Sequence, residues 1–292
     1  MTLQRLVYSA DGTLLAPLRI GGFLLVTVAT VMLLGGMADA VYVASRTTGP
    51  LVSSWIILVS LYVAHVVMLR VVEKRDWSSA GLGRSDARAL PLASGAFLGA
   101  LAIGVPSVIL LGAGWLQPVE ATGSTADWWR FAAWMVVFLA PAALWEELAF
   151  RGYIFDVLRR ELGAPVALGS TSILFGIIHW NNPGAGLRPL LFVSLAGVLL
   201  GAILLATRSV YAAWTAHFAW NWVLAALLHA DVSGFLPSAP PEYRVMDSGP
   251  DWLTGGSWGP EGGAAAGAGM LAGLGFLYAR SRRRAERGEL RS

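Results

Sequence analysis

Two adjacent glutamates and an arginine lie within an otherwise apolar stretch of this chain. Glu146, Glu147 and Arg151 fall between about residues 128 and 158, where most side chains are apolar. A charge near the middle of a membrane helix costs roughly 2.5 to 3.5 kcal/mol on insertion scales, so such residues usually serve a function. The four-residue spacing on a helix favours an ion pair between Glu147 and Arg151. Glu146 is rotated by about 100° from Glu147 and is therefore predicted to remain free for chemistry.

Two histidines and an asparagine extend this polar set. His179 ends the run Phe175-Gly-Ile-Ile-His179, while His217 and Asn221 are four residues apart and share one face of a helix. At a rise of about 1.5 Å per residue, Glu146, His179 and Asn221 are predicted to lie roughly 18 to 21 Å from the cytoplasmic ends of their helices. His217 is predicted to lie nearer 12 Å from that end. We therefore expect the four polar groups to meet.

These residue types are suited to activating a water molecule. A carboxylate and an imidazole can act as general base and orienting partner, which are the roles predicted for Glu146 and His179. His217 and Asn221 can donate hydrogen bonds to an oxyanion, an effect worth about 3 to 4 kcal/mol per donor in favourable cases. The simpler interpretation is that these groups only join helices by hydrogen bonds, but six polar groups on three helices exceed what packing requires. Cysteine is absent, which excludes a cysteine nucleophile and thiolate ligands.

The composition predicts that membrane helices position these residues. The chain has 292 residues, of which 56% are hydrophobic and only 13% charged, with a mean hydropathy of +0.61. Apolar runs long enough to cross a hydrocarbon core of about 30 Å are predicted at 18–38, 51–72, 89–114, 130–158, 165–180, 187–206, 209–229 and 262–279. We therefore predict an all-α, polytopic membrane helix bundle with about eight transmembrane helices enclosing a polar intramembrane cavity.

No repeat or second composition class divides the chain. We predict a single integral membrane domain over 1–292, with a motif-bearing core at about 130–229 and a basic cytoplasmic tail at 280–292. The segment 231–261 is rich in Pro, Gly, Ser and Asp and is predicted to be an irregular outer loop that covers the mouth of the bundle.

The basic residues predict the orientation of the chain. All of the 21 Lys and Arg residues except Arg46, Arg130, Arg188 and Arg244 fall on one side of the predicted spans. The positive-inside rule then places both termini in the cytoplasm. Because these charges act as topology determinants, we expect no nucleic-acid partner. The Ala, Gly and Arg usage favours a multi-pass protein of a bacterial plasma membrane.

Three motifs in order resemble those of the CAAX protease and bacteriocin-processing family, also called CPBP or Abi. The family's Glu-Glu-x-x-x-Arg, Phe-x-x-x-His and His-x-x-x-Asn/Asp motifs are matched by Glu146, Glu147 and Arg151, by Phe175 and His179, and by His217 and Asn221. The resemblance covers about residues 130 to 229. It implies an intramembrane endopeptidase similar to type II CAAX prenyl endopeptidases, whose substrate is a peptide or protein that is membrane-associated or cleaved near its C-terminus.

Two alternatives remain open beside a Glu/His-activated water with a His/Asn oxyanion site. In a zinc-dependent intramembrane metalloprotease, Glu146, His179 and His217 would be the Zn²⁺ ligands. We favour a mechanism without metal or other cofactor because there is no His-Glu-x-x-His helix and Asn is a poor zinc ligand. The other alternative is a non-catalytic membrane scaffold or bacteriocin-immunity protein. A proton-coupled transporter is disfavoured because the sequence shows no paired inverted repeats.

Overall fold

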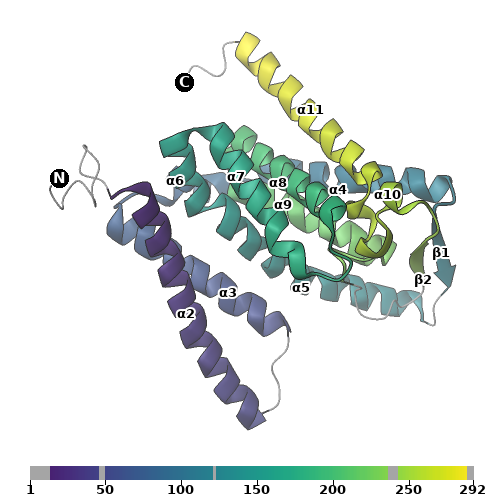
Figure 1. The fold of residues 1–292 in the computed structure, drawn as a ribbon, viewed down its shortest axis with the longest axis horizontal. Helices are drawn as coiled ribbons and strands as arrows, with labels where there is room; N and C mark the ends of the chain where they lie inside the picture. The colour runs from purple at the N-terminus through teal and green to yellow at the C-terminus, as the bar shows by residue number, and fades with distance from the viewer. Residues whose placement is uncertain (1–13, 46–49, 121–122, 236–242, 288–292) are drawn as a thin grey trace.

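The computed structural model describes residues 14–45, 50–120, 123–235 and 243–287, and most of these residues are helical (Figure 1). The α-helices are α2 (Ala16–Ser45), α3 (Pro50–His65), α4 (Ala89–Gly112), α5 (Thr125–Arg151), α6 (Tyr153–Leu162), α7 (Ala164–Ile177), α8 (Leu187–Thr207), α9 (Val210–Trp222), α10 (Asp251–Thr254) and α11 (Ala264–Glu286). Single π-helical segments continue α3 (Val66–Val72) and α9 (Val223–Leu228), and the strands β1 (Leu116–Glu120) and β2 (Tyr243–Asp247) pair antiparallel. The prediction of an all-α helix bundle is confirmed, with this one short hairpin of strands added.

Five described segments are long and apolar enough to cross a membrane, and they coincide with five of the predicted spans. They are Ala16–Asp39, Leu51–Val72, Ala89–Gly112, Thr125–Leu162 and Leu187–Thr207. The other three predicted spans are helical, as α7, α9 and α11, but these helices are not among the five that are long and apolar enough to cross a membrane. The predicted count of eight is therefore not confirmed. Helix α11 also continues through residues 280–286, which belong to the predicted basic tail.

Close packing between α4 and α9 fixes the helix that carries His217. A Cβ added at Gly95 or Gly99 would lie 2.1 Å from a carbonyl oxygen of α9, belonging to Ala212 and Ala216 respectively. Because only glycine allows two backbones to approach this closely, the glycine pair sets the distance between the two helices. By contrast, α2 packs mainly against α3 and α6 and extends away from the other helices (Figure 1).

The predicted span over 130–158 is divided into two helices, α5 and α6, because the chain breaks at Gly152. There the backbone leaves the helical region (φ −81°, ψ −126°), and the Tyr153 N–H that begins α6 donates to His65 Nε2 at 3.1 Å. The other ring nitrogen of His65 donates to the Leu61 carbonyl at 2.7 Å. A hydropathy profile cannot detect this break, because the acceptor comes from α3, a helix far away in the sequence.

We expect Gly152→Ala to destabilise the protein by about 1 to 3 kcal/mol, the usual effect of overpacking. An added Cβ would lie 2.3 Å from His65 Nε2, so either the ring or the helix break would have to move. The thermal unfolding midpoint in detergent measures the effect. Gly169→Ala is the matched control, since nothing lies within 4 Å of a Cβ there. Equal midpoints for the two variants would contradict the importance of the contact with His65.

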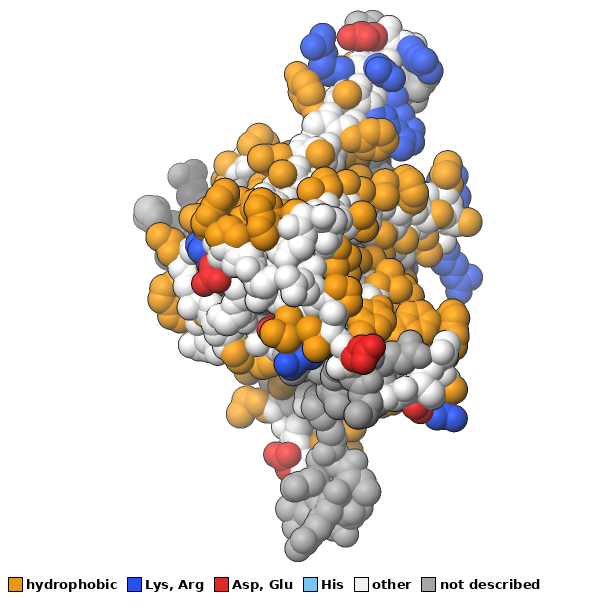
Figure 2. All heavy atoms as spheres, turned by 90° about the vertical axis from the view of Figure 1, so that its right-hand side faces the viewer, with side chains coloured by type: hydrophobic (Ala, Val, Ile, Leu, Met, Phe, Trp, Pro, Cys, Tyr) orange, Lys and Arg blue, Asp and Glu red, His pale blue; other side chains and the backbone are white. Residues whose placement is uncertain are grey.

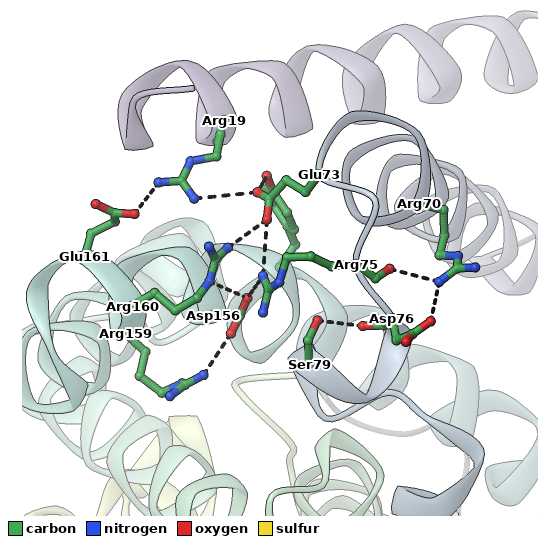
Figure 3. A network of polar contacts seen from close by, with 11 residues as sticks. Arg19, Arg70, Glu73, Arg75, Asp76, Ser79, Asp156, Arg159, Arg160 and Glu161 are labelled. Atoms are coloured by element: carbon green, nitrogen blue, oxygen red, sulfur yellow. Dashed lines mark hydrogen bonds and ion pairs between the residues drawn. The ribbon is translucent and has the colours of Figure 1, made fainter. Parts of the chain in front are cut away.

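A cluster of charged side chains joins three segments at one end of the bundle (Figure 3). Arg75 Nη1 lies 2.6 Å from Asp156 Oδ2, and Arg160 Nη2 lies 2.9 Å from Glu73 Oε2. Arg19 of α2 pairs with Glu161 of α6 in the same cluster. The topology prediction places all of these residues on the cytoplasmic side, and their ion pairs require that they share one side.

Candidate active site

Glu147 and Arg151 form a fully buried ion pair within α5. The Glu147 side chain is 0% exposed, and Arg151 Nη1 donates to its Oε1 at 3.0 Å. Arg151 Nη2 also donates to the Gly197 carbonyl of α8 at 3.1 Å, and the guanidinium carbon lies 4.4 Å from the centre of the Phe175 ring. The partner expected from the four-residue spacing is thus present. Arg151 lies in the core, however, and the charge count was wrong to include it among the cytoplasmic basic residues.

His217 of α9 bridges the two adjacent glutamates. Its Nδ1 lies 2.9 Å from Glu147 Oε1, and its Nε2 lies 3.9 Å from Glu146 Oε2. Because an ionised carboxylate only accepts hydrogen bonds, Nδ1 must carry the proton in the first contact. One oxygen of Glu147 therefore accepts from both Arg151 and His217, and it orients the imidazole so that Nε2 is directed toward Glu146.

His179 is oriented by its own helix end. It lies in the short helical turn Ile178–Asn181 that follows α7, and its Nδ1 donates to the Phe175 carbonyl at 2.7 Å. The ring packs against Phe175 and Trp258, with centroid distances of 5.1 and 6.5 Å. Since the backbone carbonyl can only accept, the neutral ring has its proton on Nδ1 and a free lone pair on Nε2.

The four predicted chemical groups line one cavity of about 910 Å³: Glu146, His179, His217 and Asn221. The Glu146 side chain is 17% exposed, and its Oε2 has no hydrogen-bond partner among the described residues. Aromatic side chains of α5, including Trp134, Phe138 and Trp145, form much of the wall. The cavity thus combines a largely apolar lining with these polar side chains, and the buried Glu147–Arg151 pair supports His217 through its contact with Glu147.

A loop anchored by a further carboxylate closes part of the cavity. Glu261 Oε1 accepts from the Ser233 backbone N–H at 2.6 Å and from its hydroxyl at 2.7 Å, and Oε2 accepts from Trp220 Nε1 at 2.8 Å. Ser233 and Glu261 both line the cavity. Val232 and Phe235 of the same segment also line the cavity, and the segment 231–261 includes β2 and short helices, while 236–242 fall outside the described residues. Sequence reasoning missed Glu261, because a lone acid among Gly and Pro is typical of a solvent-exposed loop.

The geometry does not provide a three-ligand metal site within the described part of the chain. There, no group of three His, Cys, Asp or Glu side chains is arranged so that it could hold a metal ion. A zinc mechanism requires at least three protein ligands around the ion. Glu146, His179 and His217 do not form such a set in this arrangement, so no reaction step is derived through a metal.

Residues 128–223 match one protein-family model, described as Type II CAAX prenyl endopeptidase Rce1-like. The chain carries an Rce1-like domain. The match covers about a third of the chain, runs from the start of α5 through α9, and includes all three motifs. No curated protein and no solved structure matches the chain. Together with five described helices that are long and apolar enough to cross a membrane, this match supports an integral membrane protein.

Proposed function

We propose that the Rce1-like domain hydrolyses a peptide bond within the membrane. In this proposal Glu146 and His179 activate a water molecule, and His217 and Asn221 stabilise the oxyanion. The observation that carries the proposal is that these four side chains, from three separate segments, line the same cavity. The substrate is a peptide or protein segment that is membrane-associated or ends near the cleaved bond, since the largely apolar wall favours an apolar chain.

In the proposed reaction, Glu146 takes up one proton and later releases it. Its carboxylate accepts a proton from the water while the water oxygen bonds to the carbonyl carbon, and the π electrons of the carbonyl move to its oxygen. The free Nε2 lone pair of His179 accepts the second hydrogen of the water and orients it. When the intermediate collapses, the C–N bond breaks and Glu146 returns its proton to the departing amine.

The hydrogen bonds of His217 determine the form in which it can act. Its Nδ1 already donates to Glu147 at 2.9 Å, so Nε2 can donate to an oxyanion only when the ring is a doubly protonated imidazolium. In that form His217 and Arg151 together balance the two carboxylates Glu146 and Glu147. The reaction then begins from a cluster with no net charge, which a poorly hydrated site requires.

We also propose that both termini are cytoplasmic in a bacterial plasma membrane. The clustering of Arg19, Glu73 and Asp156 at one end of the bundle supports a common side for these segments.

The test is cleavage of a library of membrane-associated peptides by the purified protein, with and without a strong chelator. We expect cleavage that persists in chelator and is lost in His179→Ala, because that variant lacks the group that orients the water. His229→Ala is the matched control: His229 is also buried but does not line the cavity.

Two results would contradict the proposal in different ways. Loss of cleavage on chelation with recovery on added Zn²⁺ would favour a metalloprotease. No cleavage of any peptide by the wild-type protein would favour a membrane scaffold or immunity protein.

A further inference from the structure

A second and larger hollow lies between α4 and α11, away from the candidate active site. It is a groove of about 1200 Å³ with its base along α8. The two helices touch closely at Gly269, where an added Cβ would lie 2.0 Å from the Ala102 carbonyl oxygen. Toward its C-terminal end, α11 diverges from the bundle (Figure 1). The groove is therefore a wedge between two helices that separate after a tight crossing.

The walls of the groove are apolar side chains with no protein cover. Phe97 of α4 is 66% exposed and Phe276 of α11 is 56% exposed, and both line the groove. Leu90 and Leu101 continue the same wall along α4. In an integral membrane protein such a surface is covered by lipid acyl chains, because water contact would be unfavourable over this area.

One end of the groove is positively charged and has no acidic partner. Arg208, at the C-terminal end of α8, and Arg280 and Arg284, one turn apart on α11, all line it, and its lining contains no Asp or Glu. Among the described residues, none of these three arginines forms an ion pair with a carboxylate, whereas the neighbouring Arg282 pairs with Glu286. Figure 2 shows basic side chains gathered at the projecting end of α11, beside a largely hydrophobic face.

We propose that this groove binds one anionic phospholipid. Its phosphate would pair with Arg280, Arg284 and Arg208, and its acyl chains would lie along the apolar side chains of α4 and α11. Charge and shape together select this occupant: a free phosphate would use only the arginine end, and a zwitterionic lipid would bring its own cation against three arginines. Basic pockets between transmembrane helices are known to favour anionic head groups for this reason.

The test is native mass spectrometry of protein released from nanodiscs that contain equal amounts of phosphatidylglycerol and phosphatidylcholine. We expect wild-type protein to retain one phosphatidylglycerol in preference to phosphatidylcholine. The variant R280Q/R284Q should lose this preference by roughly tenfold, since each arginine near the surface contributes to the attraction. The control R84Q/R282Q removes the same number of positive charges from exposed positions outside the groove lining and should keep the preference.

Two further measurements distinguish a lipid bound in the groove from other kinds of anion binding. Ala272→Phe fills an exposed part of the groove without changing charge and should also reduce retention of phosphatidylglycerol. Soluble glycerol phosphate should not displace the retained lipid. The proposal would be overturned if the wild-type protein retained both lipids equally, or if the control R84Q/R282Q lost the preference as much as R280Q/R284Q. It would also be overturned if Ala272→Phe retained as much phosphatidylglycerol as the wild type, or if glycerol phosphate displaced the lipid. Because none of these readouts uses peptide cleavage, their result is independent of the proposed protease activity.

Discussion

Replacing Glu146 by glutamine is expected to lower the rate of peptide cleavage by roughly 100- to 10 000-fold, the range attributed to a general base. Glutamine keeps the size of the side chain but cannot accept a proton from water. The Glu146 side chain is 17% exposed, and its buried Oε2 has no hydrogen-bond partner among the described residues, so the fold should not depend on its charge. The measurement combines initial cleavage rates with the thermal unfolding midpoint of the same preparation.

The neighbouring residue and a distant one provide the comparison for this prediction. Glu147→Gln should lower both activity and the unfolding midpoint, because Glu147 holds Arg151 and His217 in place. Glu120→Gln, at an exposed position of β1, should change neither. If Glu146→Gln cleaved at the wild-type rate, Glu146 would not be the base, and the proposed mechanism would fail at its first step.

Arg151→Gln is expected to destabilise the protein by about 3 to 5 kcal/mol, the typical cost of leaving a buried charge without its partner. Among the described residues, the substitution leaves Glu147, which is 0% exposed, with His217 as its only remaining ion-pair partner. It also removes the hydrogen bond to the Gly197 carbonyl at 3.1 Å, which joins α5 to α8. Unfolding free energies measured in mild detergent as a function of denaturant would show the loss.

A double-mutant cycle distinguishes the charge effect from the loss of packing. The double variant Glu147→Gln/Arg151→Gln should lose less unfolding free energy than the two single variants lose in sum, because the double variant leaves neither member of this pair charged and unpaired. Arg282→Gln is the control for an exposed pair, in which the two side chains are 64% and 65% exposed and 3.5 Å apart; it should cost less than about 1 kcal/mol. Strict additivity of the two single changes would show that the buried pair does not act through charge.

The fold class and most of the candidate site could be predicted because they depend on local spacing. Apolar runs of about 20 residues indicate membrane helices whatever their neighbours are. The four-residue intervals between Glu147 and Arg151 and between His217 and Asn221 place each pair on one helix face. Glu146, His179, His217 and Asn221, the residues predicted to do chemistry, are all among those that line the cavity.

Contacts between distant segments could not be predicted in the same way. Nothing local to α5 indicates that His65 accepts the Tyr153 N–H and so ends the helix at Gly152. Likewise, the spacing placed His217 and Asn221 on one helix face but gave no sign that His217 Nδ1 binds Glu147 of α5 at 2.9 Å. Glu261 gave no sequence signal, since its partners Ser233 and Trp220 lie 28 and 41 residues away.

The sequence by itself determined that this is a membrane helix bundle with acid, imidazole and amide groups on its apolar helices, because composition and helical periodicity are local properties. Only the tertiary structure decided which nitrogen of His217 is engaged, which glutamate is buried, and where the long apolar segment breaks. Each of these depends on a hydrogen bond or ion pair between helices, and such contacts exist only after the helices have packed.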